Sequence, residues 1–234
     1  VNGPCTEQLV QAAPDGMESA AARSLPLILA EAEQAGLSPA QTAYVLATVE
    51  RESNMGNLME ELGGQNKPYA PYYGRGYVQI THKENYIYWS NRLGVDLVNN
   101  RELATQPEIA AKILVQGMQE GIYTGVTPSG TLIPGGGYKL SDFINDNEID
   151  FYNARRIVNG TDRASEIANK AQDYYDVLKG CQAPSGTATG QFSHPAPGYA
   201  VTSEFGPRRS PCAGCSSFHK GIDLATPTGT NIAD

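Results

Sequence analysis

The chain has 234 residues, with 17 Lys and Arg against 25 Asp and Glu, which gives a formal net charge of −8. This acidic balance argues against nucleic acid as a partner, because nucleic acid attracts basic surfaces. Hydrophobic residues make up 40% of the chain, which is enough for a packed core. The apolar runs are too short for a membrane span. The chain begins at Val1 and not at Met, which is compatible with removal of an export signal.

Helical patterns dominate the first 180 residues. Ser38 followed by Pro39 and Gln41 predicts an N-cap, a proline at the first helical position and a capping box. Pro26 predicts a kink or a second helix start. We predict helices at 18–36, 38–52, 83–93, 102–120, 139–144, 150–157 and 162–178. Segments rich in Gly, Asn, Pro or Tyr predict loops at 53–76 and 125–137, and the next segment, 77–81, reads as extended.

The composition changes after the last predicted helix. Residues 182–191 carry no charge and few large apolar side chains, which is typical of a flexible linker. Prolines, glycines and short β-like stretches follow in 192–234. We therefore predict a mainly α domain over 1–181, a linker, and a short β-type C-terminal fragment.

Four cysteines occur, at positions 5, 181, 212 and 215. An even number in such a chain favours an oxidising compartment. Cys5 and Cys181 flank the helical domain, so a disulfide between them would tie its ends together; two free thiols are the alternative. Cys212 and Cys215 form either a small local disulfide or half of a metal site.

Two carboxylates close the helix predicted at 38–52. Glu52 follows Val45 by seven residues and Val49 by three, so it shares their apolar face. A carboxyl group against that face would have a raised pKa and could act as a general acid. Glu50 follows Leu46 by four residues, so periodicity does not choose between the two. A solvated Glu at a helix end is the simpler reading of either.

The most informative string is YYGRGYVQITHKENY at 72–86. Two glycines around Arg75 allow a sharp turn and a close approach to a ligand. Gln79, Thr81 and Asn85 offer hydrogen bonds, and the tyrosines offer flat faces to sugar rings. Without further information, a tyrosine-rich core loop is the competing reading.

This string resembles the signature of family 19 glycoside hydrolases, the chitinases and related endolysins of the lysozyme superfamily. It matches in register at Gly74, Arg75, Gly76, Gln79, Ile80, Thr81, Asn85 and Tyr86. The resemblance spans about residues 25–180 and implies a two-lobed, lysozyme-like fold. It also places Glu52-Ser53 at the family's helix-terminal His-Glu-Ser/Thr, with Arg51 in place of His.

By this resemblance Glu52 is the general acid, and the general base lies eight or nine residues later, at Glu60 or Glu61, with Glu61 preferred. Thr81 would help to hold the attacking water. The remaining residues implied to bind sugar are Tyr73, Arg75, Gln79, Asn85 and, from the late string ARRIVNG, Asn159. The resemblance also implies that the glycosidase domain needs no cofactor.

The C-terminal fragment 192–234 is similar to the start of lysostaphin-type zinc metallopeptidases, which cut peptide cross-links in peptidoglycan. Their His-x-x-x-Asp pair matches His219 and Asp223, two zinc ligands. A catalytic zinc site needs about three protein ligands, and the later His-x-His of that family is absent before Asp234. The zinc site is therefore incomplete, and zinc is expected only with the missing half of the domain. A structural site formed by these two residues with Cys212 and Cys215 is the alternative.

These observations favour a secreted, periplasmic or cell-wall glycosidase that cleaves β-1,4 bonds of peptidoglycan or chitin with inversion. The peptidase-like fragment favours peptidoglycan. We expect a monomer whose partner is the polysaccharide, with no nucleic acid and no membrane span. The competing hypothesis is a catalytically silent glycan-binding module that docks a downstream peptidase, and Arg51 is the feature that favours it.

Overall fold

The computed structural model describes residues 3–125 and 133–182 and, nearer the C-terminus, four short strands between 201 and 224. The chain forms two compact units, Val1–Lys179 and Gly180–Asp234. The described α-helices are α1 (Gly3–Ala12), α2 (Glu18–Gln34), α3 (Pro39–Ser53), α4 (Lys83–Leu93), α5 (Pro107–Glu120), α6 (Leu140–Phe143) and α7 (Ala164–Gln182). Short 3-10 turns connect them: η1 (Asn54–Gly56), η2 (Gly64–Asn66), η3 (Arg101–Thr105) and η4 (Asn153–Ile157).

The predicted start of α3 is confirmed in detail. The Ser38 hydroxyl accepts a hydrogen bond from the backbone N–H of Gln41 at 3.2 Å. The Gln41 side chain in turn accepts one from the backbone N–H of Ser38 at 3.1 Å. This capping box satisfies two N–H groups that the first helical turn leaves unpaired. It fixes where α3 begins, and therefore where its last turn presents Glu50 and Glu52.

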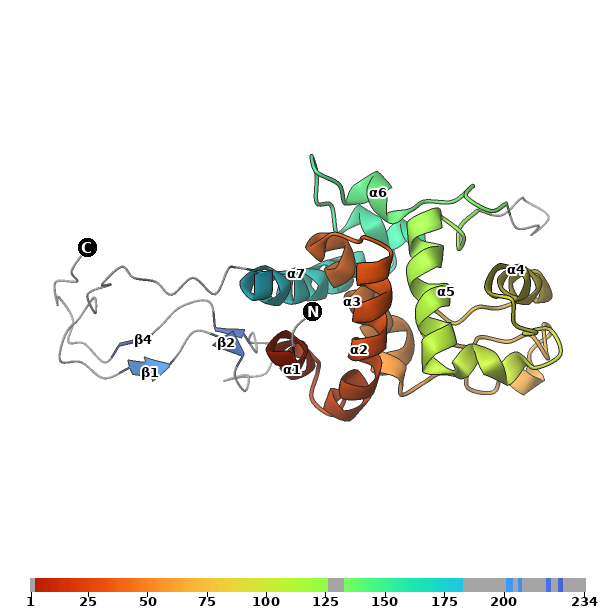
Figure 1. The fold of residues 1–234 in the computed structure, drawn as a ribbon, viewed down its shortest axis with the longest axis horizontal. Helices are drawn as coiled ribbons and strands as arrows, with labels where there is room; N and C mark the ends of the chain where they lie inside the picture. The colour runs from red at the N-terminus through yellow and green to blue at the C-terminus, as the bar shows by residue number, and fades with distance from the viewer. Residues whose placement is uncertain are drawn as a thin grey trace. The chain divides into compact units, whose positions relative to one another are not determined.

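The core lies where α2, α3 and α5 pack together. Helix α2 contacts α1 and α5, and α3 contacts α2 and α5 (Figure 1). Fully buried side chains from these helices include Leu25, Ile28, Val45, Leu46 and Leu114. Burial of each such side chain contributes about 1.5–3 kcal/mol. Pro26 lies inside α2, which runs through it as one helix in place of a second start.

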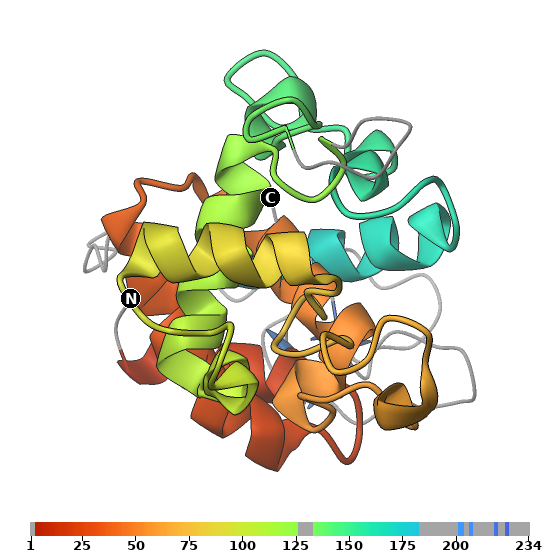
Figure 2. The same ribbon diagram turned by 90° about the vertical axis from the view of Figure 1, so that its right-hand side faces the viewer.

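Several predicted elements differ from the observed ones. Helix α1 was not predicted from the sequence. The segment 77–81 forms turns, with only a bridge between Arg75 and Ile80. The helix expected at 150–157 is the 3-10 turn η4, and α7 continues past the expected stop at Gly180. Figure 2 shows the region between α3 and α4 as loops and short turns, as expected.

Cys5 of α1 and Cys181 of α7 are both disulfide-bonded, in the one disulfide that the described residues contain. The predicted Cys5–Cys181 bond is therefore present. Cys212 and Cys215 lie outside the described residues, so their bond stays a prediction.

The C-terminal unit contains two small antiparallel pairs. Strand β1 (Val201–Ser203) pairs with β4 (Asp223–Leu224), and β2 (Gly206–Pro207) pairs with β3 (Phe218–His219). His219 and Asp223 thus lie in strands, and their side chains are outside the description. Among the described helices, none is long and apolar enough to cross a membrane.

Candidate active site

Glu52 lies in the last turn of α3, where the chain turns sharply. Asn54 and Met55 both adopt positive φ angles, 49° and 57°, and end the helix. The carboxylate of Glu52, 23% exposed, accepts a hydrogen bond at 2.7 Å from Nη1 of Arg155 in η4, which is 3% exposed. The Arg155 Nε donates to the backbone carbonyl of Asp162 at 3.1 Å, which holds the guanidinium in place. Helical periodicity placed Glu52 on the apolar face of α3. The structure adds a buried cation from a distant segment, which contacts the carboxylate.

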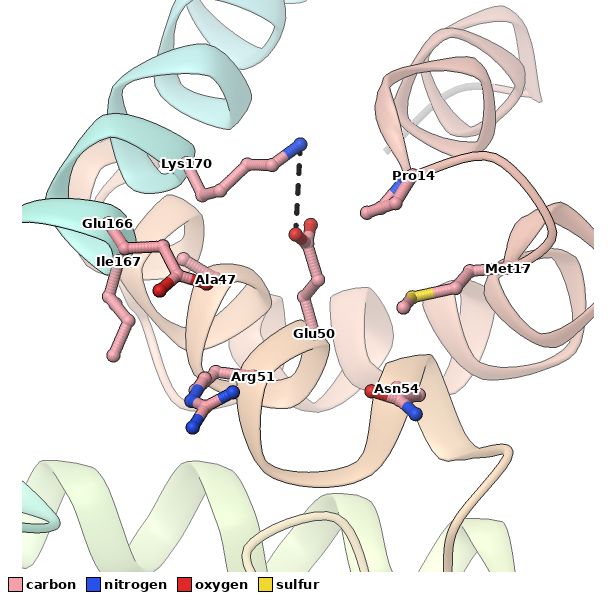
Figure 3. Close-up of a pocket in the computed structure, with 9 residues that line it drawn as sticks. All are labelled: Pro14, Met17, Ala47, Glu50, Arg51, Asn54, Glu166, Ile167 and Lys170. Carbon is pink, nitrogen blue, oxygen red and sulfur yellow. Dashed lines mark ion pairs between the residues drawn. The ribbon is translucent and has the colours of Figure 1, made fainter. Parts of the chain in front are cut away.

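Glu50 points to a different part of the molecule. Its side chain is 11% exposed and faces α7, where Tyr174 Oη donates to it at 2.6 Å and Lys170 Nζ lies 3.7 Å away (Figure 3). Burial raises the pKa of Glu50, and the nearby Lys170 opposes that effect. The two carboxylates that periodicity left undecided therefore have different environments, Glu50 against α7 and Glu52 against η4.

The second pair of carboxylates lies beside the GRG motif. The backbone N–H of Glu61 donates to the carbonyl of Gly74 at 2.8 Å, and the N–H of Gly76 donates to the carbonyl of Met59 at 2.9 Å. Isolated antiparallel bridges join Glu60 to Arg75 and Arg75 to Ile80. Because successive side chains of an extended segment point in opposite directions, Glu60 and Glu61 face different neighbours.

Glu61 is held by two donors. Its carboxylate accepts a hydrogen bond from the N–H of Gly74 at 3.0 Å and from the hydroxyl of Tyr69 at 2.7 Å. These bonds favour the charged form and lower the pKa of Glu61, the Gly74 bond most strongly. A Cβ at Gly74 would lie 2.9 Å from Gln79 Oε1 and 3.3 Å from Glu61 Cβ. Glu61 and Gln79 therefore lie on the same side of Gly74, where a larger residue would crowd them.

Glu60 instead pairs with Arg75. The Arg75 Nε donates to Glu60 at 3.0 Å, while its Nη1 donates to the carbonyl of Pro71 at 3.0 Å and to the hydroxyl of Tyr86 at 2.9 Å. The guanidinium also lies 3.8 Å from the ring centroid of Tyr73. Arg75 is 6% exposed. These contacts organise the loop from inside, whereas the sequence analysis placed Arg75 among the sugar-binding residues.

The polar residues of the motif form a short chain of hydrogen bonds. Gln79, at φ 56°, donates from Nε2 to the carbonyls of Gly76 and Leu58 at 2.8 and 3.2 Å. Thr81 Oγ1 donates to the carbonyl of Gln79 at 3.0 Å, and Asn85 Nδ2 donates to the carbonyl of Thr81 at 2.6 Å. All three polar side chains are half-buried, so each keeps a solvent-facing part.

Leu58 connects the two parts of the candidate site, which are the end of α3 and the motif segment 72–86. The N–H of Leu58 donates to the carbonyl of Ser53 at 3.0 Å, and the carbonyl of Leu58 accepts the bond from Gln79. The end of α3, which carries Glu52, is thereby tied to the motif segment. Asn159 is exposed and follows η4, its N–H donating to the carbonyl of Arg155 at 3.0 Å.

Sequence reasoning missed two residues that hold the carboxylates, Arg155 and Tyr69. Arg155 lies inside the string ARRIVNG, from which only Asn159 was chosen. Arg156 follows it directly, and the sequence did not show which of the two arginines is buried. In the described part of the chain, no group of three or more His, Cys, Asp or Glu side chains could hold a metal ion.

Comparisons with known proteins define the fold. No protein-family model matches the chain. Over 41 residues it is 51% identical to Chitinase 11 of Oryza sativa subsp. japonica, a match that covers 18% of this chain and only 16% of that protein.

Two solved structures are similar over a longer range. Chitinase C from Streptomyces griseus HUT6037 gives a TM-score of 0.51 at 18% identity, covering 76% of this chain and 78% of that one. A mutant of chitinase C gives the same TM-score and coverage at 17% identity. The predicted mainly α, lysozyme-like fold is therefore confirmed. The resemblance of the C-terminal fragment to metallopeptidases gains no support from these comparisons.

Proposed function

We propose that this protein is a glycosidase that hydrolyses β-1,4 bonds in peptidoglycan or chitin with inversion at the anomeric carbon. The observation that carries the proposal is the pair of Glu52 and Glu61, which two hydrogen-bonding networks hold on segments joined through Leu58. The local identity to a rice chitinase and the shared fold with chitinase C support it.

In this proposal Glu61 is the general base. Its lowered pKa keeps it ionised at neutral pH, and each carboxylate oxygen that accepts one hydrogen bond retains a lone pair for a water molecule. Glu60 is less suitable because its carboxylate is committed to Arg75. Thr81 would orient the water, since its hydroxyl oxygen still accepts hydrogen bonds while its proton goes to the Gln79 carbonyl.

Glu52 is the proposed general acid. When a carboxylic acid gives its proton to the leaving oxygen it becomes a carboxylate, and the Arg155 guanidinium at 2.7 Å would stabilise that product. An inverting enzyme needs about 6.5–9.5 Å between its two carboxyl groups, so that a water fits between base and sugar. We expect this separation for Glu52 and Glu61 with substrate bound, and an inverted anomer as the first product.

The sugar would be held by Gln79 and Asn85 of the motif segment and by Asn159 after η4, with Tyr73 as a stacking surface. We further propose a monomer that acts outside the cell or in the periplasm, and a separate C-terminal module after a linker at 182–191. If the module is the start of a metallopeptidase domain, His219 and Asp223 are two of its zinc ligands. Peptidoglycan is then the favoured substrate.

The test is release of reducing ends from purified peptidoglycan and from chitin. Glu52→Gln and Glu61→Gln should each lower the rate by about 10²–10⁴-fold, as expected for loss of a general acid or base. Glu60→Gln should lower it much less, and Glu7→Gln, at an exposed position of α1, serves as the matched control. His219→Ala should leave glycan cleavage unchanged.

Full activity of Glu52→Gln would exclude it as the acid. An inactive unmutated protein that still binds either glycan would favour the competing hypothesis of a silent glycan-binding module. A first product with retained configuration would contradict the inverting mechanism.

A further inference from the structure

A pocket of about 360 Å³ lies on a part of the first unit that the proposed reaction does not use (Figure 3). It is bounded by one face of α3, where Ala47, Glu50 and Arg51 lie at helical spacing, and by Asn54, which follows the helix. The α3 residue Glu52 is two positions beyond Glu50, a rotation of about 200°, and so lies on the opposite side of the helix. The pocket is therefore separate from the carboxylate pair of the candidate active site.

Two acidic and two basic residues line the pocket, and Arg51 is the one among them without a charged partner in the described part of the chain. Glu50 is compensated by Lys170 at 3.7 Å and by the Tyr174 hydroxyl at 2.6 Å. Glu166, the other acidic residue at the pocket, pairs with Arg163 at 3.3 Å. The side chain of Arg51 is exposed and forms no hydrogen bond or ion pair with any described residue. Figure 3 shows Arg51 and Lys170 on either side of Glu50. A ligand with a negative group would meet a free guanidinium here.

The rest of the lining is apolar. Pro14 and Met17, from the connection between α1 and α2, face Ala47 of α3 and Ile167 of α7. Ligand pockets in proteins hold about 300–1,000 Å³, so this volume suits a small ligand. A free guanidinium binds a carboxylate through two parallel hydrogen bonds. Walls formed by Pro, Met, Ala and Ile suit short aliphatic groups.

We propose that this pocket binds the free carboxylate end of a short peptide with small apolar side chains, such as the terminal alanine of a peptidoglycan stem peptide. The carboxylate pairs with Arg51, and the terminal methyl group lies against Ile167, on the same side of Glu50 as Arg51 in Figure 3. The Asn54 amide, on the other side, meets the peptide backbone. The inference rests on the proposed function only in naming peptidoglycan as the source of the peptide. It makes the pocket a second point of attachment that chitin, which carries no peptide, does not use.

The test is isothermal titration of the full chain with N-acetyl-alanyl-alanine and with the same peptide as its C-terminal amide. The free acid should bind saturably. The amide should bind at least about tenfold more weakly, because hydrogen bonds from a guanidinium to a charged carboxylate are stronger than those to a neutral amide. Arg51→Gln should weaken binding of the acid by a similar factor. Arg23→Gln, at an exposed position of α2 outside the pocket, is the matched control and should change nothing.

No saturable binding of the acid, equal binding of acid and amide, or unchanged binding by Arg51→Gln would each overturn the proposal. Because Arg51 is exposed, its substitution does not disturb the core, and a circular dichroism melt of each variant checks this. Glu52→Gln should bind the peptide as the unmutated chain does. Peptide binding without any glycan cleavage by the unmutated chain would therefore contradict the proposed function and leave the pocket assignment intact.

Discussion

Substitution of Arg155 by Gln tests the contact that most distinguishes the folded site from its sequence. The ion pair with Glu52 has an N–O distance of 2.7 Å and side-chain exposures of 3% and 23%. Exposed pairs contribute about 0–1 kcal/mol, while loss of one partner of a fully buried pair costs about 3–5 kcal/mol. This pair lies between those limits, and Arg155→Gln also loses the bond to the Asp162 carbonyl. We expect the free energy of unfolding to fall by about 2–3 kcal/mol.

That loss should be visible in a thermal melt. For a domain of 150–250 residues, 1 kcal/mol shifts the Tm by about 2–4 °C, so a decrease of roughly 4–12 °C is expected. The double variant with Glu52→Gln isolates the pair itself, and its coupling energy in urea denaturation should be about 1–3 kcal/mol. Arg163→Gln is the control, since its pair with Glu166 is more than half exposed at both ends and should contribute less than about 1 kcal/mol.

A coupling energy below about 0.5 kcal/mol would refute the reasoning, because it would mean that the Arg155–Glu52 contact is no more stabilising than a surface pair. The same result would remove the argument that Arg155 stabilises the Glu52 carboxylate during catalysis.

Two further predictions concern stability. Burial raises the pKa of Glu50 in the folded state, so the folded protein binds the carboxyl proton more tightly than the unfolded chain does. The stability that this proton contributes is lost as the pH rises from the unfolded pKa of about 4.3 through the raised folded pKa. Glu50→Gln should therefore gain stability relative to the unmutated chain across that window in urea denaturation at several pH values; a constant difference would contradict the assigned cause. Removal of the disulfide by Cys5→Ser and Cys181→Ser opens a very long loop and should cost up to about 5 kcal/mol. Peptide mass spectrometry without reduction should find these two cysteines joined, and free thiols there would count against the bond.

Local sequence patterns determined the helical framework. The capping box of Ser38 and Gln41 and the proline at the start of α3 were readable because each acts within one helical turn. The YYGRG string likewise predicted a folded loop rich in hydrogen bonds. Helix α1 lacked such signals, and it is held by packing against α2 and by the disulfide of Cys5.

Only the tertiary structure decided how the carboxylates are used. Periodicity could not separate Glu50 from Glu52, because the partners that distinguish them, Tyr174 and Arg155, lie more than 100 residues away in the sequence. The neighbouring Glu60 and Glu61 differ only because an extended backbone points one at Arg75 and the other at Gly74 and Tyr69. The sequence determines which residue types are available to form a site. The environment that sets the charge and orientation of each one is assembled by contacts between segments that are far apart along the chain.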